Sequence, residues 1–444
     1  MAPTPHNNSV RASGIAITAF AGVQWLGFMF ANTVVIPLSI GAAFHLSDAA
    51  VSGDMARSFI VTGIACLLQV LFGHKLPLME GQSGLWWGLI LSLANIGVSS
   101  GIPLATVGGS MESGMVLGGL AIVLLGVFGL YKVLNRLFTP IVMAVLLMLL
   151  ASQLVDIFFR GMLGIDATGH LTPSVASLAI AVSILVAVLT IAGRGLLSNF
   201  SILIGIALGW FAYHLFIHAA SPVVRPNLQD VTQTFAWGRP AWNAGIVMAT
   251  VMTALINTTN TIATLRASEP LFNSAVTSAQ FRRSFLFTGM FTFVSGPLSI
   301  VPYAPYTSSI GFLRTTRLLN LAPFIVGAGL FTLLGLIPQL AGFFSRLPIS
   351  IGDAVLVIAY FQLFGSALHN LQGLTFDFRT VFRIAGPVLI GLAILSMPAT
   401  VFQSLPGFAQ GICANGMLVG ILLSVLLENL VPWKHWATEN MPRN

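Results

Sequence analysis

The chain alternates long apolar runs with short polar connections over almost its whole length. A helix that crosses a bilayer needs about 20 predominantly apolar residues, and fourteen segments approach this pattern. The segments cover residues 13–37, 57–73, 82–99, 112–131, 137–157, 172–192, 198–218, 244–265, 284–299, 306–320, 322–343, 349–368, 381–398 and 409–430. The pattern predicts an all-α polytopic membrane protein with fourteen transmembrane segments.

The third and the tenth segments are defective as simple helices. Pro77 and Gly81 interrupt the approach to the third, and Pro302 and Pro305 precede the short tenth. Irregular backbone at membrane depth must be buried in protein or line a cavity. Fourteen segments divide into two halves of seven with opposite orientation, and the two defects occupy corresponding places. This predicts a 7+7 inverted repeat with a substrate site at the paired breaks; ordinary loops at these prolines are the alternative.

Composition supports a membrane location and argues against several classes of function. Of the residues, 56% are hydrophobic and 7% are charged, against about 25% charged in soluble domains. The net charge of +7 comes from basic residues scattered between apolar runs, which argues against a nucleic-acid partner. Two cysteines in apolar segments form no CxxC pair, so no metal or cofactor is expected. Without a Walker A motif or a DxxxD or DDxxD run, we expect a transporter rather than an ATPase or a membrane prenyltransferase.

The basic residues indicate how the chain is oriented. With the N-terminus inside, 14 of the 19 Lys and Arg residues fall in inner connections and tails. The outer connections then hold Arg57, Arg160, Arg225, Arg239 and Arg346. The positive-inside rule assigns such an excess to the cytoplasm, so both termini are expected there. Residues 1–10 are polar and lead through Arg11 into a long apolar run, so we expect a retained first span and no cleavable signal peptide.

Polar side chains in the eighth and tenth segments are candidates for substrate binding. Asn257 and Asn260 are three residues apart and share one face of a helix. Each amide offers two donors and an acceptor oxygen, which suit a ligand rich in N–H and C=O groups. Ser308 and Ser309 follow the two prolines, where free backbone N–H groups at a half-helix N-terminus favour a carbonyl oxygen. Hydrogen bonds between helices and helix capping are the structural alternatives.

Two acidic residues are candidates for proton coupling. Glu80 lies between Pro77 and Gly81, beside the third segment, and Asp353 lies in the twelfth. An acidic residue within a membrane segment is a functional hypothesis by default. The alternatives are a salt bridge from Glu80 to Lys75 or Arg266, and a structural role for Asp353 at a loop edge or in the gate.

Aromatic rings beside the predicted breaks could hold a flat ligand. Trp25, Trp86 and Tyr306 flank the presumed site, and Gly84 closes the broken stretch of the third segment. Stacking of rings contributes roughly 0.5–1.5 kcal/mol beyond the area that they bury. Packing in the core or at the membrane interface is the alternative for each ring.

Several stretches of the chain share a pattern with one known family. They are Gly22–Pro37, Met79–Gly81, Gly84–Gly88, Asn257–Thr261, Ser308–Gly311 and Leu430–Trp433. The sequence resembles the nucleobase–cation symporter-2 family, the nucleobase–ascorbate transporters, and in particular its bacterial purine-permease branch associated with purine and allantoin breakdown. The resemblance covers nearly the whole chain.

The resemblance implies a core domain and a gate domain that move against each other. The expected parts are a cytoplasmic tail (1–12), core (13–133), gate (134–243), core (244–345), gate (346–434) and a second cytoplasmic tail (435–444). The third and tenth segments would each contain a short strand, with substrate between these strands and the eighth segment. Proton symport, a homodimer and a multi-pass location in the bacterial inner membrane are also implied.

The sequence departs from the family pattern at positions that bear on substrate choice. Ile256 or Asn257 lies where members carry a carboxylate, with Asn257 favoured by its chemistry, and Trp25 lies where a histidine is common. Ser308 and Ser309 replace a pair that usually begins with Glu or Gln. Such an amide-and-hydroxyl site favours import of a neutral oxopurine, or of a ureide such as allantoin, over uracil. An inorganic-anion transporter of the same architecture and an uncoupled facilitator are the alternatives.

Overall fold

The computed structural model describes residues 6–129, 136–165, 170–217 and 228–433. Its α-helices are α1 (His6–Ala31), α2 (Val35–Ala43), α3 (Asp48–Leu71), α4 (Gly84–Ser99), α5 (Leu104–Phe128), α7 (Pro140–Met162), α8 (Pro173–Ala192), α9 (Leu196–Asn199), α10 (Ser201–Phe216), α11 (Leu228–Thr232), α12 (Ala244–Phe272), α13 (Ser278–Leu298), α14 (Ser308–Thr316), α15 (Leu321–Gly335), α16 (Pro338–Phe344), α17 (Ile349–Asn370), α18 (Phe378–Leu395), α19 (Gly407–Cys413) and α20 (Gly416–Leu430). A 3₁₀ helix, η1 (Ala399–Phe402), and two strands, β1 (Glu80–Gln82) and β2 (Tyr303–Pro305), complete the described elements. The expected tail 435–444 and four basic residues counted for the orientation lie outside the described residues: Lys132, Arg225, Lys434 and Arg443.

Each of the fourteen predicted segments coincides with a helix, a strand followed by a helix, or a pair of shorter helices. Among the described residues, eight helices are long and apolar enough to cross a membrane, or nine if α15 and α16 form one span. Helix α14 has only nine residues, and α4, α10 and α20 are shorter apolar helices. These helices support a mostly helical, multi-pass membrane protein. The count of fourteen spans and the 7+7 repeat stay predictions.

The eleventh segment, predicted as one helix over 322–343, is bent in the structure. Helices α15 and α16 meet at 88°. Pro338 begins α16, and Ile337 before it has the extended backbone that a residue preceding proline prefers. The segment therefore consists of two helices, and its role as one span stays a prediction.

Two further helices begin earlier than the hydropathy pattern indicates. Helix α3 starts at Asp48, so Arg57 lies inside a helix and is 3% exposed, not in an outer connection. Helix α5 starts at Leu104 and carries Glu112 in its interior, fully buried. Both charged residues had marked the predicted ends of segments, and both belong to the packed interior.

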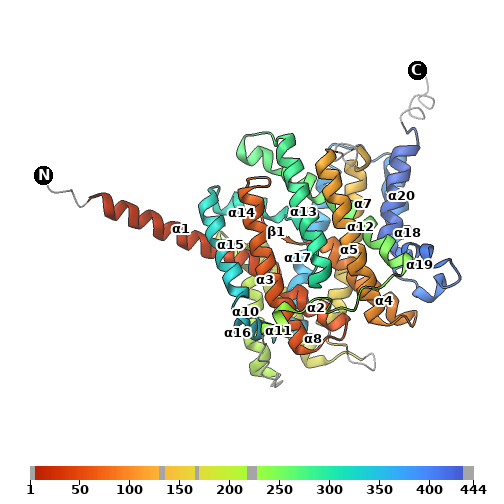
Figure 1. Cartoon of the computed structure of the whole chain (residues 1–444), viewed down its shortest axis with the longest axis horizontal. Coiled ribbons are helices and arrows are strands. Elements are labelled where there is room, and N and C mark those ends of the chain that lie inside the picture. The colour runs from red at the N-terminus through yellow and green to blue at the C-terminus, as the bar shows by residue number, and fades with distance from the viewer. Residues whose placement is uncertain (1–5, 130–135, 166–169, 218–227, 434–444) are drawn as a thin grey trace, which may run out of the picture.

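The expected strands are present, and they pair with each other. Strands β1 and β2 are antiparallel, with Gly81 opposite Ala304 and Gln82 opposite Tyr303. The Ser83 N–H donates to the Pro302 carbonyl at 2.8 Å and extends the pairing. Figure 1 shows β1 in the middle of the molecule, near α3 and α13. Two breaks separated by more than 200 residues therefore meet at one place.

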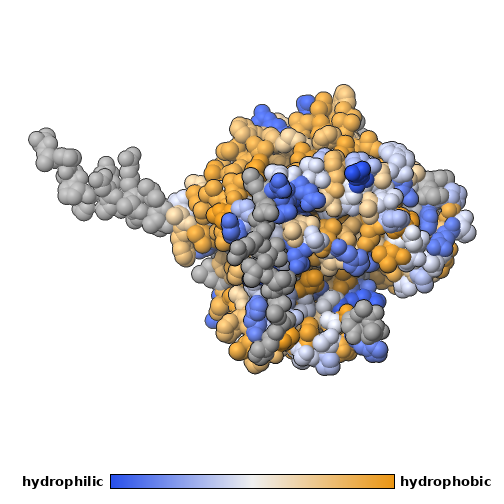
Figure 2. All heavy atoms as spheres, turned by 60° about the horizontal axis from the view of Figure 1, so that its bottom comes forward, coloured by the Kyte–Doolittle hydropathy of each residue, from blue (hydrophilic) through white to orange (hydrophobic). Residues whose placement is uncertain are grey.

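Close helix packing surrounds the strand pair. Helices α5 and α13 approach so closely that a Cβ on Gly289 would lie 2.7 Å from the backbone nitrogen of Val123. Small residues allow such approach between membrane helices. Large apolar side chains cover much of the outer surface instead, as the orange regions of Figure 2 show. Ile191, 85% exposed, and Phe211, 70% exposed, belong to this surface, which suits contact with lipid.

Candidate functional site

The amide of Asn257 joins α12 to β2 and to Ser83, the residue directly after β1. Its Nδ2 donates to the Tyr303 carbonyl on β2 at 2.9 Å. Its Oδ1 accepts hydrogen bonds from the Ser83 hydroxyl at 2.6 Å and from Asn260 Nδ2 at 3.1 Å. Asn257 is fully buried. The sequence-based candidate is therefore at the strand pair, where it fixes the strands and orients Asn260.

One face of the strand pair packs into the protein, and we call Glu80, Gln82 and Tyr303 its inner face. Glu80 Oε1 accepts a hydrogen bond from the Thr288 hydroxyl of α13 at 2.8 Å. Gln82 Nε2 donates to the Ser58 hydroxyl of α3 at 2.9 Å. The Tyr303 hydroxyl accepts a bond from Thr62 of α3 at 3.3 Å. All three side chains of the inner face are almost or completely buried.

The opposite face consists of small residues covered by tyrosine rings. Because side chains alternate along a strand, Gly81 lies away from the inner face, and a Cβ there would come within 2.9 Å of the Tyr306 ring. The Tyr306 hydroxyl donates to the Gln82 carbonyl. A Cβ on Gly84 would lie 3.1 Å from the Tyr360 hydroxyl of α17. We call Gly81, Gly84, Tyr306 and Tyr360 the tyrosine face.

The two candidate serines differ in accessibility. Ser309 is buried, and its hydroxyl accepts a hydrogen bond from the Met79 N–H at 3.0 Å. Ser308, at the start of α14, is exposed. Asn260, Gly84 and Tyr306 are partly exposed. The candidates thus divide into buried residues that hold the strands and residues that are accessible to solvent.

The two candidate tryptophans are completely buried. The Trp25 ring packs against Phe312 of α14 and Phe324 of α15, at centroid distances of 4.6 and 4.8 Å. Trp86 lies in the first turn of α4, directly after the strand. Their packing supports the helices that carry Ser308 and Gly84, and neither ring is accessible in this conformation.

The candidate acids occupy different parts of the structure. Asp353 of α17 faces α7, where a Cβ on Gly161 would collide with its carboxylate. Its Oδ1 makes no hydrogen bond. Glu80 lies on the inner face instead, so the structure places the two acids in separate helix packings. His74, in the connection before β1, is no further candidate, since burial lowers its pKa to about 3 and keeps it neutral.

Sequence reasoning missed three residues that shape this site. Gln82 had a usable signal, because strand alternation places it on the same face as Glu80. Tyr303 directly follows Pro302 in the tenth segment and could have been noticed there. Tyr360 had no such signal, since only the fold brings α17 against Gly84.

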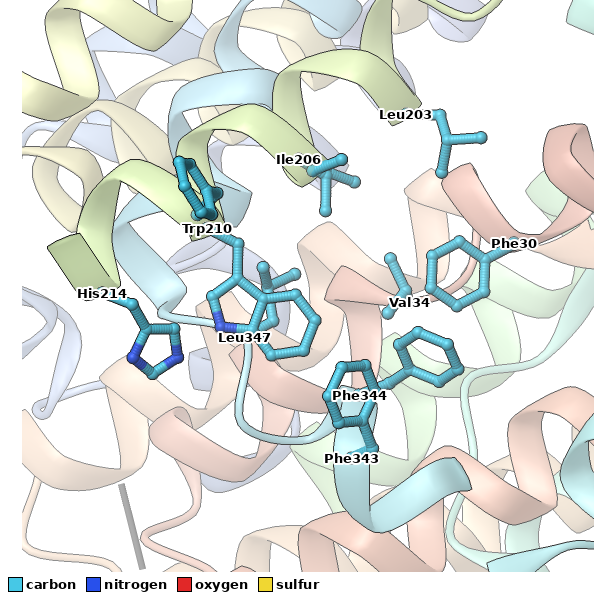
Figure 3. A pocket seen from close by; sticks show the side chains of 11 residues that line it. Phe30, Val34, Leu203, Ile206, Trp210, His214, Phe343, Phe344 and Leu347 are labelled. Atoms are coloured by element: carbon cyan, nitrogen blue, oxygen red, sulfur yellow. The ribbon is translucent and has the colours of Figure 1, made fainter. Parts of the chain in front are cut away.

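Two cavities lie away from the strand pair. One, of about 410 Å³, is lined mainly by α10 and α16, with Trp210 and His214 from α10 and Phe344 from α16 (Figure 3). Apart from the Trp210 indole and the His214 imidazole, the lining is apolar. A ligand rich in donors and acceptors finds few partners there. The other, of about 580 Å³, lies between α2 and the connection that carries Arg346.

The match to a family decides what class of protein this geometry serves. A family model described as a permease family, Xan_ur_permease, matches residues 16–400. The chain belongs to the nucleobase–cation symporter-2 family. The matched region of the permease includes both strands and every candidate residue, so the protein is a membrane transporter and not an enzyme.

Relatives of the permease match over nearly their full length. "Putative purine permease YwdJ" of Bacillus subtilis (strain 168) is 26% identical over 435 residues, covering 94% of this chain and 97% of that protein. Xanthine permease of the same organism is 23% identical, covering 94% of each chain. Uric acid permease PucK, also from Bacillus subtilis (strain 168), is 21% identical, covering 92% of this chain and 94% of that protein.

Solved structures share the fold of the permease. The transmembrane domain of a cyanobacterium bicarbonate transporter, BicA, has a TM-score of 0.60 and 13% identity, covering 92% of this chain and 96% of that chain. SLC26A9 also has a TM-score of 0.60, with 10% identity, covering 93% of this chain and 65% of that chain. At such identities the likeness concerns the fold alone.

Proposed function

We propose that this permease imports a purine-type nucleobase, or a purine-derived ureide such as allantoin, and binds it beside the tyrosine face. The observation that carries this proposal is the set of accessible groups on α12, on α14 and on the connection between β2 and α14. Tyr306 offers a flat ring, Asn260 an amide and Ser308 a hydroxyl. A planar heterocycle with N–H and C=O groups can stack on the ring and pair with both polar groups.

The chemistry of these groups supports a neutral ligand. The accessible candidates carry amide and hydroxyl groups, while Glu80 lies on the inner face and bonds to Thr288. The relatives described above are named for purine, xanthine and uric acid. A neutral oxopurine therefore fits better than uracil, which offers a smaller surface for stacking, and allantoin offers more N–H and C=O groups than uracil does.

The proposed movement is an elevator-like displacement of the core against the gate. The proposed core comprises residues 13–133 and 244–345, and the proposed gate comprises 134–243 and 346–434. The close approach of Gly84 to Tyr360 lies at this boundary and would change as the parts slide. We place the permease in the bacterial inner membrane as a homodimer with both termini in the cytoplasm, by family resemblance and by the distribution of basic residues.

Coupling is proposed to use protons, with Glu80 as the first candidate. Its carboxyl group is fully buried and lies on the strand that borders the substrate. No arginine or lysine is among its described hydrogen-bond partners, so a buried negative charge there would be costly and protonation would relieve it. Asp353 is the second candidate, and uncoupled facilitation is the outcome if neither acid matters.

Uptake into proteoliposomes tests the substrate assignment. Purified permease should take up labelled xanthine, with competition by other oxopurines and allantoin and weaker competition by uracil. Asn260→Ala should lower uptake, while Asn95→Ala, an exposed asparagine on α4, serves as the matched control. Saturable uracil uptake without competition from any purine or from allantoin would overturn the proposal.

A further inference from the structure

A second buried polar cluster lies on the α3 side of the strand pair. Asp54 and Arg57 of α3 are 2% and 3% exposed, and Glu112 of α5 is fully buried. We call these three residues the arginine cluster. None of them belongs to the accessible set around the tyrosine face.

The guanidinium group of Arg57 is only partly satisfied by hydrogen bonds. Its Nη1 donates to the Asp230 carbonyl of α11 at 2.7 Å. Its Nε and Nη2 are buried and make no hydrogen bond. Arg57 interacts electrostatically with the carboxyl groups of Asp54, Glu112 and Asp230. Glu112 itself accepts a bond from the Ser299 hydroxyl at 2.6 Å.

The charges inside the cluster do not balance. Two almost completely buried carboxyl groups interact electrostatically with one guanidinium, whereas Asp230 on α11 is only partly buried and can be solvated. Tyr303 of β2 also faces Asp54. The neighbouring helices α2, α15 and α16 contribute no titratable side chain. An uncompensated buried charge is costly. One proton bound to either carboxylate would neutralise the excess negative charge of the cluster.

A hydrogen-bond chain connects the cluster to the strand. The Ser58 hydroxyl donates to Asp54 Oδ1 at 3.3 Å and accepts from Gln82 Nε2 at 2.9 Å. The other amide atom of Gln82, Oε1, makes no hydrogen bond. If Asp54 is protonated, its O–H can donate to Ser58, whose hydroxyl then donates to Gln82 Oε1 after the amide turns. The protonation state of Asp54 thereby determines the orientation of the Gln82 amide on β1.

We propose that the arginine cluster is a proton-binding site that communicates with the strand pair through Ser58 and Gln82. One proton enters beside the partly exposed Asp230 and binds a carboxylate of the cluster in the state described here, and it leaves when another state of the transport cycle opens the cluster to water. This inference rests on the proposed coupled transport, and it adds a proton site that is distinct from Glu80 and is reached through Gln82 on the same inner face.

Infrared spectroscopy tests the site without any substrate. Wild type at neutral pH should show a protonated-carboxyl band that Asp54→Asn or Glu112→Gln reduces. Asp48→Asn, an exposed aspartate at the start of the same helix, should leave the band unchanged. An equal band in the wild type and both cluster variants would overturn the proposal, whether or not the permease carries purines.

Transport tests the connection to the strand. In proteoliposomes with an imposed pH gradient, Asp54→Asn and Ser58→Ala should lower xanthine accumulation about tenfold or more, within the usual range of coupling between sites, while counterflow exchange is retained. Ser58→Ala keeps the charges of the cluster and should also keep the infrared band. Wild type that takes up no nucleobase contradicts the proposed function and not the proton site.

A folding defect is recognised separately in these variants. A variant that loses counterflow together with its thermal transition has failed to fold. The infrared band of the conservative variant Glu112→Gln then tests the proton site in its place. Full gradient-driven accumulation by a folded Ser58→Ala protein would overturn the proposed connection.

Discussion

The two faces of the strand pair differ in how their polar groups are used. On the inner face, Glu80, Gln82 and Tyr303 are buried and bond to α13 and α3. On the tyrosine face, glycine backbones carry no side chains, and the tyrosines that cover them are only partly buried. The difference shows how one short sheet serves two purposes: bonds to the interior hold the inner face rigid, and small residues keep the other face open to rings.

The largest loss of transport is expected from Asn257→Ala, because Asn257 bonds to β2 and to Ser83 directly after β1. The change leaves the buried Ser83 hydroxyl and Tyr303 carbonyl without their partner, and each unsatisfied group costs about 1–3 kcal/mol. We expect the initial rate of xanthine uptake to fall more than about tenfold, as 1.4 kcal/mol corresponds to tenfold. Uptake is measured at matched membrane levels with Asn95→Ala as control. Unchanged affinity and rate would remove Asn257 from the site.

The inner face is tested next with Glu80→Gln. The amide keeps the size of the side chain and can still accept the bond from Thr288, but it cannot exchange a proton. Accumulation driven by a pH gradient should be lost, while exchange of substrate across the membrane continues. A mutant that still concentrates substrate and responds to a protonophore as wild type does would exclude Glu80 as the coupling group, and Asp353→Asn would be tested in its place.

The tyrosine face is tested with Gly81→Ala. The added Cβ would lie 2.9 Å from the Tyr306 ring, so the ring must shift. We expect a KM for substrate that is several-fold higher, equivalent to about 1 kcal/mol, with little change in thermal stability. Gly365→Ala on α17 is the control, since nothing lies within 4 Å of a Cβ there. Equal KM values in both variants would show that the position of the ring does not matter.

The smallest effect is expected from Tyr306→Phe. The ring remains available for stacking, and only the hydrogen bond to the Gln82 carbonyl is lost. A hydrogen bond of this kind contributes about 0.5–1.5 kcal/mol, so KM should rise only a few-fold. Tyr306→Ala, which also removes the ring, should raise KM further. If both variants behave alike, Tyr306 contributes through its hydroxyl and not through stacking.

The sequence determined the features that depend on local pattern. Apolar runs placed a helix in all fourteen segments, and proline with glycine marked the two breaks, because both signals act within a few residues. The same local information located Asn257 and Ser309 near the strands. Local pattern cannot separate the buried Asn257 and Ser309 from Asn260 and Ser308, because the residues of each type lie close together in the sequence. Only the fold shows which of these side chains are buried and which are accessible.

The positions of the buried charged residues depend on the tertiary structure. Arg57 and Glu112 stand at the start of their predicted segments, because a charged residue lowers the local hydropathy and so marks a segment boundary. In the fold they lie inside α3 and α5, where Arg57 interacts with Asp54 and Glu112. Burial of these charges is tolerable only when opposite charges lie close to them. Asp54 lies on the same helix as Arg57, but Glu112 and Asp230 are distant in the chain and come close to Arg57 only in the fold, so no local pattern contains the complete set.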